Sequence, residues 1–363
     1  MLSSKLISIC IPTYNRARHL GEALASIVPQ MDNDVEIVIS DNASTDNTRE
    51  MVRQYEEKFG SIRYFRNLTN LGFDRNLLAC LEHAEGEYVW LFGSDDLMKP
   101  GAVEAVRQSL RDQPVFVYLN FQVISPEGDL LIGPKIEIPE NRDFRDGLAC
   151  IQELGGNLGY MSAAILRRHL CPKVPASHEL VGYGWIHLHM ILRFLRESGI
   201  VRYIGQPLVQ ARRTPSLEYN FAERMVTELD RVIWHARRDG YARSTLRKLT
   251  NKIIREFQLG HAVGLKCAGH PEFGQFVLAC FKRYWTYPLF WLLIVSVFLV
   301  PRGVLLPIRD YLRARRAASV LSASIKGTDS RASCGAAPTR LHSPGATYKQ
   351  AFFEKRTGGG REN

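Results

Sequence analysis

Three short polar segments in the first hundred residues contain the side chains best suited to chemistry. They read PTYNR at residues 12–16, DNASTD at 41–46 and SDD at 94–96. Their hydroxyl, amide and carboxylate groups can donate and accept hydrogen bonds, and neighbouring carboxylates can share a divalent cation with phosphate oxygens. The segments therefore indicate a polar ligand, and the third one favours a phosphate held through a cation.

Each segment also has an ordinary structural explanation. Asp46 stands just before a predicted helix, so capping that helix is a more favoured role for it than contact with a ligand. Asp95 and Asp96 would suit a solvated turn equally well. Because adjacent carboxylates repel each other, a cation between this pair and a phosphate is the more specific interpretation.

The elements that position these segments alternate between strand-like and helix-like patterns. We expect strands at 6–11, 35–40, 62–65, 87–92 and 115–121, and helices at 18–28, 48–59, 73–84 and from about Pro100 onward. This alternation is typical of an α/β fold with a largely parallel sheet. Ligands of such sheets lie at the carboxyl ends of the strands, where all three polar segments fall.

The second half of the chain is less regular. We expect a hairpin over 122–139, a helix over 184–198, a strand over 200–209 and Arg-rich helices over 217–264. Residues 319–363 are poor in apolar side chains, and their composition predicts a disordered tail.

Composition excludes several classes of protein. The 363 residues include 45% hydrophobic and 23% charged side chains, enough to bury a core. The seven Cys form no CxxC pair, so we expect reduced thiols and neither a zinc site nor a disulfide framework. The apolar run before Pro12 is too short for a signal peptide, which predicts a cytoplasmic start. The net charge of +10 lies largely after residue 280, which favours an anionic membrane over nucleic acid.

A short apolar run near the C-terminus has basic flanks. Residues 289–300 carry no charge, Pro301 ends the run, and Pro307 interrupts the apolar stretch at 304–308. Residues 302–316 then contain five Arg and one Asp. This pattern predicts an interfacial or re-entrant anchor on the cytoplasmic leaflet. A buried core helix is the alternative, and a complete span is ranked last because its orientation would oppose the basic flank.

Three longer stretches resemble a known family. SICIPTYNR, IVISDNASTDNT and NLGFDRNLLACLEHAEGEYVWLFGSDD are similar to the nucleotide-binding half of family 2 glycosyltransferases, which have the GT-A fold. The resemblance is close over residues 5–120 and weaker as far as 215. The WLFGSDD variant also resembles the deoxysugar transferases of O-antigen assembly, such as abequosyltransferases.

The resemblance implies roles for individual residues. Thr13 and Tyr14 would hold the base and ribose, Asp41 would accept a hydrogen bond from the nucleobase, and Arg75 would face the nucleotide or its diphosphate. Asp95 would match the last acid of the family's DxD motif and bind Mg²⁺ or Mn²⁺, whereas Gly93 or Ser94 replaces the first acid. A basic residue near the donor phosphates is implied at Arg212, with an exposed basic turn as the alternative. The predicted donor-binding set is Pro12, Thr13, Tyr14, Arg16, Asp41, Arg75, Ser94, Asp95 and Arg212, with Asp95 as the metal ligand.

The general base is harder to place. Many family members carry an acid at the start of an acceptor-side helix, but the matching stretch here, residues 182–185, has none. Glu179, His187 and His189 are the nearest groups that can accept a proton. A packed core role is favoured for His189 and a solvated loop for Glu179, while both roles stay open for His187. The predicted catalytic residues are His187 and Glu179 as candidate bases, together with Asp96.

These observations combine into one prediction. We expect an α/β GT-A (Rossmann-like) mixed sheet with flanking helices over 1–215, with 1–120 as the donor half and 121–215 as the acceptor half. A helical region over 216–283, a membrane-associating segment over 284–318 and the tail would follow. The expected activity moves a sugar, such as a deoxyhexose, from a nucleoside-diphosphate sugar to a polyprenyl-diphosphate-linked saccharide in surface polysaccharide synthesis.

We expect this activity at the cytoplasmic face of the inner membrane, in a peripheral or monotopic protein with no nucleic-acid partner. Two alternatives differ in class. A sugar nucleotidyltransferase would normally have a Gly- and Lys/Arg-rich phosphate loop after the first strand, where this chain has PTYNR. A non-catalytic, membrane-bound nucleotide-sugar-binding scaffold would fit the missing first acid and the missing base.

Overall fold

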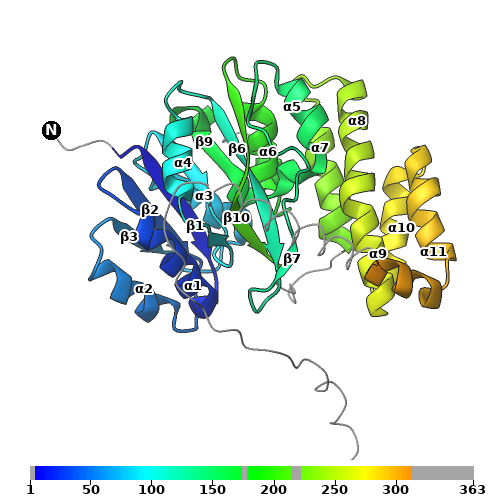
Figure 1. The fold of residues 1–363 in the computed structure, drawn as a ribbon, viewed down its shortest axis with the longest axis horizontal. Coiled ribbons are helices and arrows are strands. Elements are labelled where there is room, and N and C mark those ends of the chain that lie inside the picture. The colour runs from blue at the N-terminus through cyan, green and yellow to red at the C-terminus, as the bar shows by residue number, and fades with distance from the viewer. Residues whose placement is uncertain (1–4, 174–177, 214–221, 312–363) are drawn as a thin grey trace, which may run out of the picture. The chain divides into compact units, whose positions relative to one another are not determined.

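A computed structural model describes residues 5–173, 178–213 and 222–311. Its centre is a ten-stranded mixed sheet with the order β3-β2-β1-β4-β9-β6-β10-β5, to which β7 adds beside β6 and β8 beside β10 (Figure 1). The strands are β1 (Ile7–Thr13), β2 (Val35–Asp41), β3 (Ile62–Arg66), β4 (Tyr88–Leu91), β5 (Leu97–Met98), β6 (Phe116–Ile124), β7 (Leu130–Ile132), β8 (Arg142–Phe144), β9 (Ala164–Arg167) and β10 (Val201–Arg212). The predicted mixed α/β sheet is confirmed.

The first four strands form the parallel part of the sheet. β1 pairs in parallel with β2 and β4, and β2 pairs in parallel with β3. Every residue of β1 and β2 is buried, as the nearly continuous apolar runs of both strands require. Their β-branched residues suit a pleated surface that is covered on both faces.

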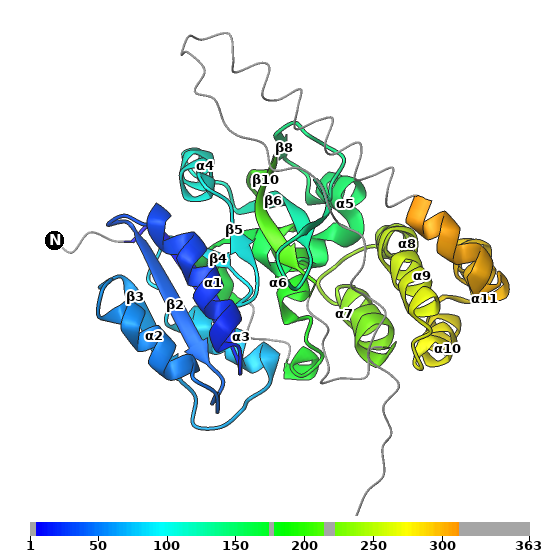
Figure 2. The same ribbon diagram turned by 60° about the horizontal axis from the view of Figure 1, so that its bottom comes forward.

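α-Helices flank the sheet. The six in the first two hundred residues are α1 (Ala17–Ile27), α2 (Thr48–Glu56), α3 (Phe73–Glu82), α4 (Ala102–Ser109), α5 (Gly147–Leu154) and α6 (Ile186–Phe194). α1 packs beside α2, whereas α3 packs across β1 and β2 (Figure 2). α1 buries Leu20, Ala23, Leu24 and Ile27, the i, i+3, i+4, i+7 spacing of a single helical face.

The acceptor-side half makes the sheet mixed. β9 lies between β4 and β6 and is antiparallel to both. β6 and β7 form the predicted hairpin, whose turn is closed by a hydrogen bond of 2.7 Å from Ser125 N to Asp129 O. β10 runs parallel to β6 and ends at Arg212.

The rest of the described chain is helical. It comprises η6 (Glu223–Glu228), α7 (Leu229–His235), α8 (Arg243–Ile253), η7 (Ile254–Gln258), α9 (Leu259–Ala268), α10 (Phe273–Tyr284), η8 (Phe290–Val295) and α11 (Ser296–Leu299). α7 and α8 share the core of the sheet, while α10, η8 and α11 bury side chains in a second, smaller core. The predicted tail at 319–363 lies outside the described residues, and the predicted domain boundaries stay predictions.

Candidate active site

The first two polar loops meet where β1 and β2 end. Thr13 and Asp41 are register partners at the last position of the two strands, and Asn42 N donates to Thr13 O at 2.9 Å. Asn15 connects the loops, because its N donates to Ser44 Oγ at 2.9 Å while its Oδ1 accepts from Thr45 N at 2.7 Å. Thr13 Oγ1 is buried in this corner and has no hydrogen-bond partner among the residues that the structure describes. Since buried hydroxyl groups are usually paired, this one marks a position for a ligand atom.

Asp41 is fully buried and firmly held. Its Oδ1 accepts from Ser44 N at 3.0 Å and from Ser44 Oγ, and its Oδ2 accepts from the Tyr64 hydroxyl. Arg66 Nε lies 3.7 Å from Oδ2. Burial and the Asp41 carboxylate raise the pKa of Tyr64, so this phenol keeps its proton and remains a donor. The carboxylate is thereby fixed in one orientation with a negative charge balanced by these donors.

An open depression adjoins Asp41. It has a volume of about 450 Å³ and is lined by Arg49, Arg53, Glu56, Tyr64, Arg66, Asn67 and Leu68. Three of these seven residues are arginines, so the lining is cationic. A polar, anionic molecule can therefore approach the ends of β2 and β3 from solvent.

The third loop joins the first through an ion pair. Arg16 Nη1 donates to Asp95 Oδ2 at 2.8 Å, and both side chains are partly exposed. Asp95 follows β4, which is the neighbour of β1 in the sheet. The predicted donor-binding residues after β1, β2 and β4 thus lie at one edge of the sheet.

Asp96 connects three segments of the chain. It is buried, its Oδ2 accepts from Ser162 Oγ, and its Oδ1 accepts from Arg212 N at 2.9 Å. Burial, reinforced by the charge of Asp95, raises its pKa to about 7. Both oxygens of this predicted catalytic acid therefore face protein donors, and the buried Ser94 lies in the same turn.

Gly93, one of the two positions that the first acid of the motif could take, has little room for a side chain. A Cβ on Gly93 would lie 2.7 Å from Asp96 Oδ2 and 3.3 Å from Ser162 Oγ. Gly93 N also donates to Ser162 Oγ at 2.8 Å. Because Asp96 and Ser162 occupy the space of a side chain, an acid at position 93 would require both of them to move.

The Arg212 guanidinium contacts the loop that contains Asp95 and holds it against neighbouring segments. Its Nε donates to Asp95 O at 2.9 Å, its Nη1 to Pro126 O at 2.6 Å, and its Nη2 pairs with Glu22 Oε2 at 2.6 Å. The side chain is only 2% exposed. The alternative of an exposed basic turn is therefore wrong, because this guanidinium is buried against the loop that it supports.

Sequence reasoning missed Asp74, which lies in the first turn of α3. It is 2% exposed and accepts hydrogen bonds from Gly182 N at 2.8 Å, Gly184 N at 2.7 Å and Ile186 N at 3.3 Å. These three donors belong to the loop that opens α6. Gly184 has φ of +72°, and a Cβ there would displace the Arg224 guanidinium, so glycine is favoured at this position. Asp74 thus connects the loop before α6 to α3 through hydrogen bonds. The next residue, the predicted donor-binding Arg75, is exposed.

The candidate bases have different surroundings. His187 is buried with Nε2 3.0 Å from Gly159 O, and its ring stacks on Trp185; burial lowers its pKa. His189 is fully buried with Nε2 2.9 Å from Asp239 Oδ2, and burial lowers its pKa too, as the packed core interpretation expects. Glu179 is exposed and pairs with Arg238. Burial thus disfavours protonation of His187, and the Glu179 carboxylate is already engaged at the surface, so the assignment of the general base stays a prediction.

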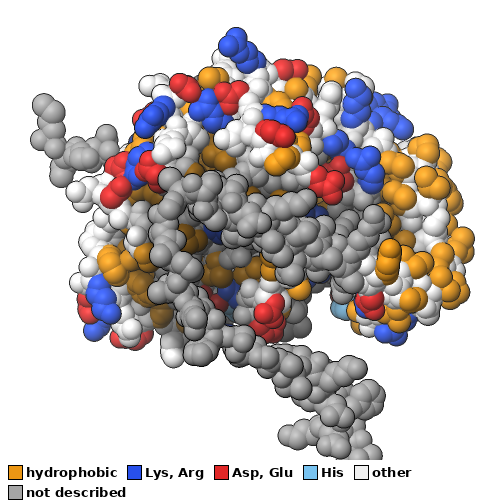
Figure 3. All heavy atoms as spheres, viewed as in Figure 1, with side chains coloured by type: hydrophobic (Ala, Val, Ile, Leu, Met, Phe, Trp, Pro, Cys, Tyr) orange, Lys and Arg blue, Asp and Glu red, His pale blue; other side chains and the backbone are white. Residues whose placement is uncertain are grey.

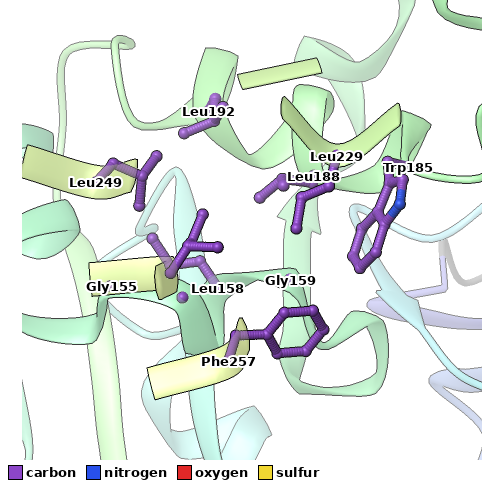
Figure 4. A pocket seen from close by; sticks show the side chains of 11 residues that line it. Gly155, Leu158, Gly159, Trp185, Leu188, Leu192, Leu229, Leu249 and Phe257 are labelled. Carbon is purple, nitrogen blue, oxygen red and sulfur yellow. The ribbon is translucent and has the colours of Figure 1, made fainter. Parts of the chain in front are cut away.

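A narrow apolar crevice lies beside α6 (Figure 4). It measures about 20 Å³, and its lining includes Leu158, Trp185, Leu188, Leu229 and Leu249, whose side chains converge in the figure. A volume of this size holds about one water molecule, and an apolar lining of this kind normally stays dry. The crevice therefore belongs to the packing between α6 and the following helices.

The residues present allow a divalent cation only in part. Within the described ranges, no three or more His, Cys, Asp and Glu side chains gather as a metal cluster. Asp95 provides one partly exposed carboxylate, whose present partner is Arg16. Mg²⁺ commonly takes one or two carboxylates and completes its shell with substrate phosphates and water. A cation is compatible with Asp95 when a phosphate supplies most of the other ligands.

Comparison with known proteins gives an independent view of the chain. The model of the family "Glycosyl transferase family 2" matches residues 8–171. An abequosyltransferase of Salmonella typhimurium is 34% identical over 222 residues, covering 57% of this chain and 66% of the relative. A GalNAc(5)-diNAcBac-PP-undecaprenol beta-1,3-glucosyltransferase of Campylobacter jejuni is 33% identical over 125 residues, covering 34% of this chain and 40% of the relative. The matches thus span about two thirds or less of these relatives.

Solved structures support the fold across most of the chain. TarS residues 1–349 of S. aureus in complex with UDP-GlcNAc superimposes with a TM-score of 0.57 at 16% identity, covering 89% of this chain and 92% of that one. The complex of the same protein with UDP gives a TM-score of 0.55 at 19% identity, covering 87% and 89%. At this level of identity the likeness establishes a shared fold.

Proposed function

Because residues 8–171 of this chain are a family 2 glycosyltransferase domain, we propose that the protein transfers a sugar from a nucleoside-diphosphate sugar to a saccharide acceptor. The observation that carries the proposal is the convergence of three strand ends. They bring a buried, unpaired Thr13 hydroxyl, an oriented Asp41 and the Arg16–Asp95 pair to one edge of the sheet. A donor with a base, a ribose and a diphosphate offers complementary groups for each of these.

Each part of this edge suits a different part of the donor. A nucleobase that donates to the buried Asp41 carboxylate has to replace Ser44 or Tyr64 as its donor, and the cationic depression beside it admits an anionic ligand. Arg16 lies where a diphosphate can attract its guanidinium away from Asp95, because phosphates bind arginine in a bidentate manner. A divalent cation at Asp95, when bound, would stabilise negative charge on the leaving diphosphate.

Two relatives guide the proposal for the sugar and the acceptor. One is named an abequosyltransferase, and this favours a deoxyhexose as the transferred sugar. The other is named for an acceptor on PP-undecaprenol, and this favours a polyprenyl-diphosphate-linked saccharide. The setting proposed for this chain is therefore the assembly of a bacterial surface polysaccharide of the O-antigen type.

A donor screen tests the proposal. The purified full chain is incubated with UDP-, GDP-, CDP- and dTDP-sugars and with Mn²⁺ or Mg²⁺, and released nucleoside diphosphate is measured. We expect release from one donor class and a loss of about a hundredfold or more in the Asp95→Asn variant. Asp143→Asn is the matched control, since Asp143 is a surface partner of Arg202. The absence of any release would favour the scaffold alternative, and pyrophosphate release from a nucleoside triphosphate and a sugar phosphate would indicate a nucleotidyltransferase.

A further inference from the structure

The last described helices expose an unusual number of large apolar side chains. We call this surface the apolar end: the outward side chains of residues 273–285 (α10 and its C-cap), of residues 290–299 and of the helix at 302–311. Six of its members, all at least 49% exposed, are Trp285, Trp291, Leu292, Leu299, Ile308 and Tyr311. Figure 3 shows hydrophobic side chains gathered over this end of the described chain. Single exposed apolar residues are common, but a contiguous group of them marks a binding surface.

The apolar end is ordered by packing on its inner side. Phe290 and Ile294 are buried in the second core together with Phe276 of α10. The Phe281 ring meets the Trp291 ring edge-on with centroids 6.1 Å apart, and Trp291 Nε1 donates to Trp285 O at 2.8 Å. One face of each helix therefore already supports the core, and the outward face is available to something else.

The ends of these helices carry positive charge. Lys282 is exposed beside Phe281, and Lys266 Nζ donates to Val297 O at 2.8 Å at the end of α11. Arg302 Nε holds Cys267 O at 3.0 Å, just after the bend. A cationic rim around an apolar face is complementary to anionic lipid headgroups over acyl chains.

The lengths of the last two helices limit how deeply this part of the chain can enter a membrane. Among the residues that the structure describes, no single helix is long and apolar enough to cross a membrane; Phe290–Leu299 and Arg302–Tyr311 meet that requirement only as a pair, bent by 114°. A ten-residue helix measures about 15 Å, half of the roughly 30 Å hydrocarbon core. Trp and Tyr side chains, such as Trp285 and Tyr311, favour the boundary between headgroups and acyl chains.

We propose that the apolar end inserts into one leaflet of an anionic membrane and holds the protein on its surface. This inference depends on the exposed side chains and their basic rim, and it stands whether or not the chain transfers sugars. It goes beyond the proposed function by giving the protein a lipid partner and a defined face toward it. A second copy of the chain is the competing occupant of such a surface.

Vesicle flotation of the purified full chain tests this proposal. We expect it to float with vesicles of phosphatidylcholine and phosphatidylglycerol, and less with phosphatidylcholine alone. The Leu292→Glu/Leu299→Glu double variant should lower the bound fraction by about tenfold or more, because two charges would have to enter the acyl region. Leu130→Glu/Leu131→Glu is the matched control, since these leucines are about as exposed as several residues of the apolar end but lie on β7.

Each outcome has a clear meaning. Loss of flotation in the first pair with retention in the control supports insertion through the apolar end. A wild-type chain that stays with the soluble fraction, or equal losses in both pairs, overturns it. A dimer in light scattering that Leu292→Glu/Leu299→Glu dissociates, without vesicle binding by the wild type, would assign the surface to a second copy. Donor hydrolysis in solution should be the same in all three proteins, so the two proposals can fail separately.

Discussion

The two functional regions of this chain depart from the usual distribution of side chains in opposite directions. Around the donor edge of the sheet, the carboxyl groups of Asp41 and Asp96, and that of Asp74 at the start of α3, are buried. At the apolar end, Trp285 and Leu299 are exposed. Buried charge is tolerated where donors surround it, whereas exposed apolar surface is stabilised only by a partner outside the chain. The contrast teaches that the buried acids of the first region have partners within the chain, whereas the exposed side chains of the apolar end face outward.

The largest expected effect comes from removing a buried acceptor. Asp74→Ala leaves three backbone N–H groups of the 182–186 loop without their partner, and we expect a loss of about 3 kcal/mol in the free energy of unfolding. Urea denaturation measures it. Asp146→Ala is the control, because Asp146 caps α5 through the single N–H of Leu148 and should cost about 1 kcal/mol. Equal losses in the two variants would show that the three hydrogen bonds to Asp74 stabilise the fold no more than the single helix cap of Asp146.

Restoring the missing acid should harm the fold. Gly93→Asp brings a side chain and a charge against Asp96, and we expect a loss of about 2 kcal/mol in the free energy of unfolding with no gain in Mn²⁺ affinity. Denaturation and calorimetric titration measure the two quantities. Gly260→Ala, where nothing lies within 4 Å of the new Cβ, should be neutral or stabilising. Tighter Mn²⁺ binding by a stable Gly93→Asp protein would contradict the steric explanation.

The buried Asp96 should make stability depend on pH. Burial raises its folded-state pKa to about 7 from an ordinary value of 3.8, so the folded state holds a proton that the unfolded state releases. The contribution of Asp96 to the free energy of unfolding is complete below the pKa of this group in the unfolded state, and it is lost as the pH rises through about 7. The free energy should fall by at most about 1.4 kcal/mol per pH unit. Denaturation between pH 4 and 8 should show a shallower decline in Asp96→Asn than in the wild type. Burial also raises the pKa of Asp230, to about 6. The contribution of Asp230 to the free energy of unfolding therefore declines with rising pH in both proteins, and the difference between the two proteins reports on Asp96.

The smallest expected effect lies at the apolar end. Leu299→Ser removes a side chain that is 71% exposed, so the free energy of unfolding in solution should change by less than about 0.5 kcal/mol. Val297→Ser, two residues away on the inner face of α11 and only 7% exposed, should lose about 2 kcal/mol or more. Denaturation without lipid measures both. A large loss in Leu299→Ser would mean that this side chain already has a partner within the chain.

Local sequence predicted the parallel part of the fold well. The ranges for β1, β2 and β3 agree with the structure to within two residues, because each is a compact apolar, β-branched run with clear polar boundaries. β9 was missed although it lies in the middle of the sheet. It has only four residues, Ala164–Arg167, and it becomes a strand through pairing with β4 and β6 rather than through a pattern of its own.

The site shows the same division between local and distant information. The meeting of Thr13, Asp41 and Asp95 was predictable because the ends of neighbouring parallel strands share an edge. The contacts of Asp74 with the loop before α6 were not, since they join segments far apart in sequence. The contacts of Arg212 with Glu22 and Pro126 could not be predicted either, because they form only when the whole sheet is assembled.

The close approach at Gly93 constrains how this motif can change over evolutionary time. Asp96 and Ser162 already fill the space that an acid at position 93 would need. A lineage that gains an acid at position 93 while Asp96 is still present would pass through a protein in which two carboxylates collide. The substitutions at 93 and 96 are therefore contingent on each other, and the order in which they occur decides which ancestors could fold. Laboratory evolution toward the two-acid motif should begin at Asp96 and reach Gly93 afterwards.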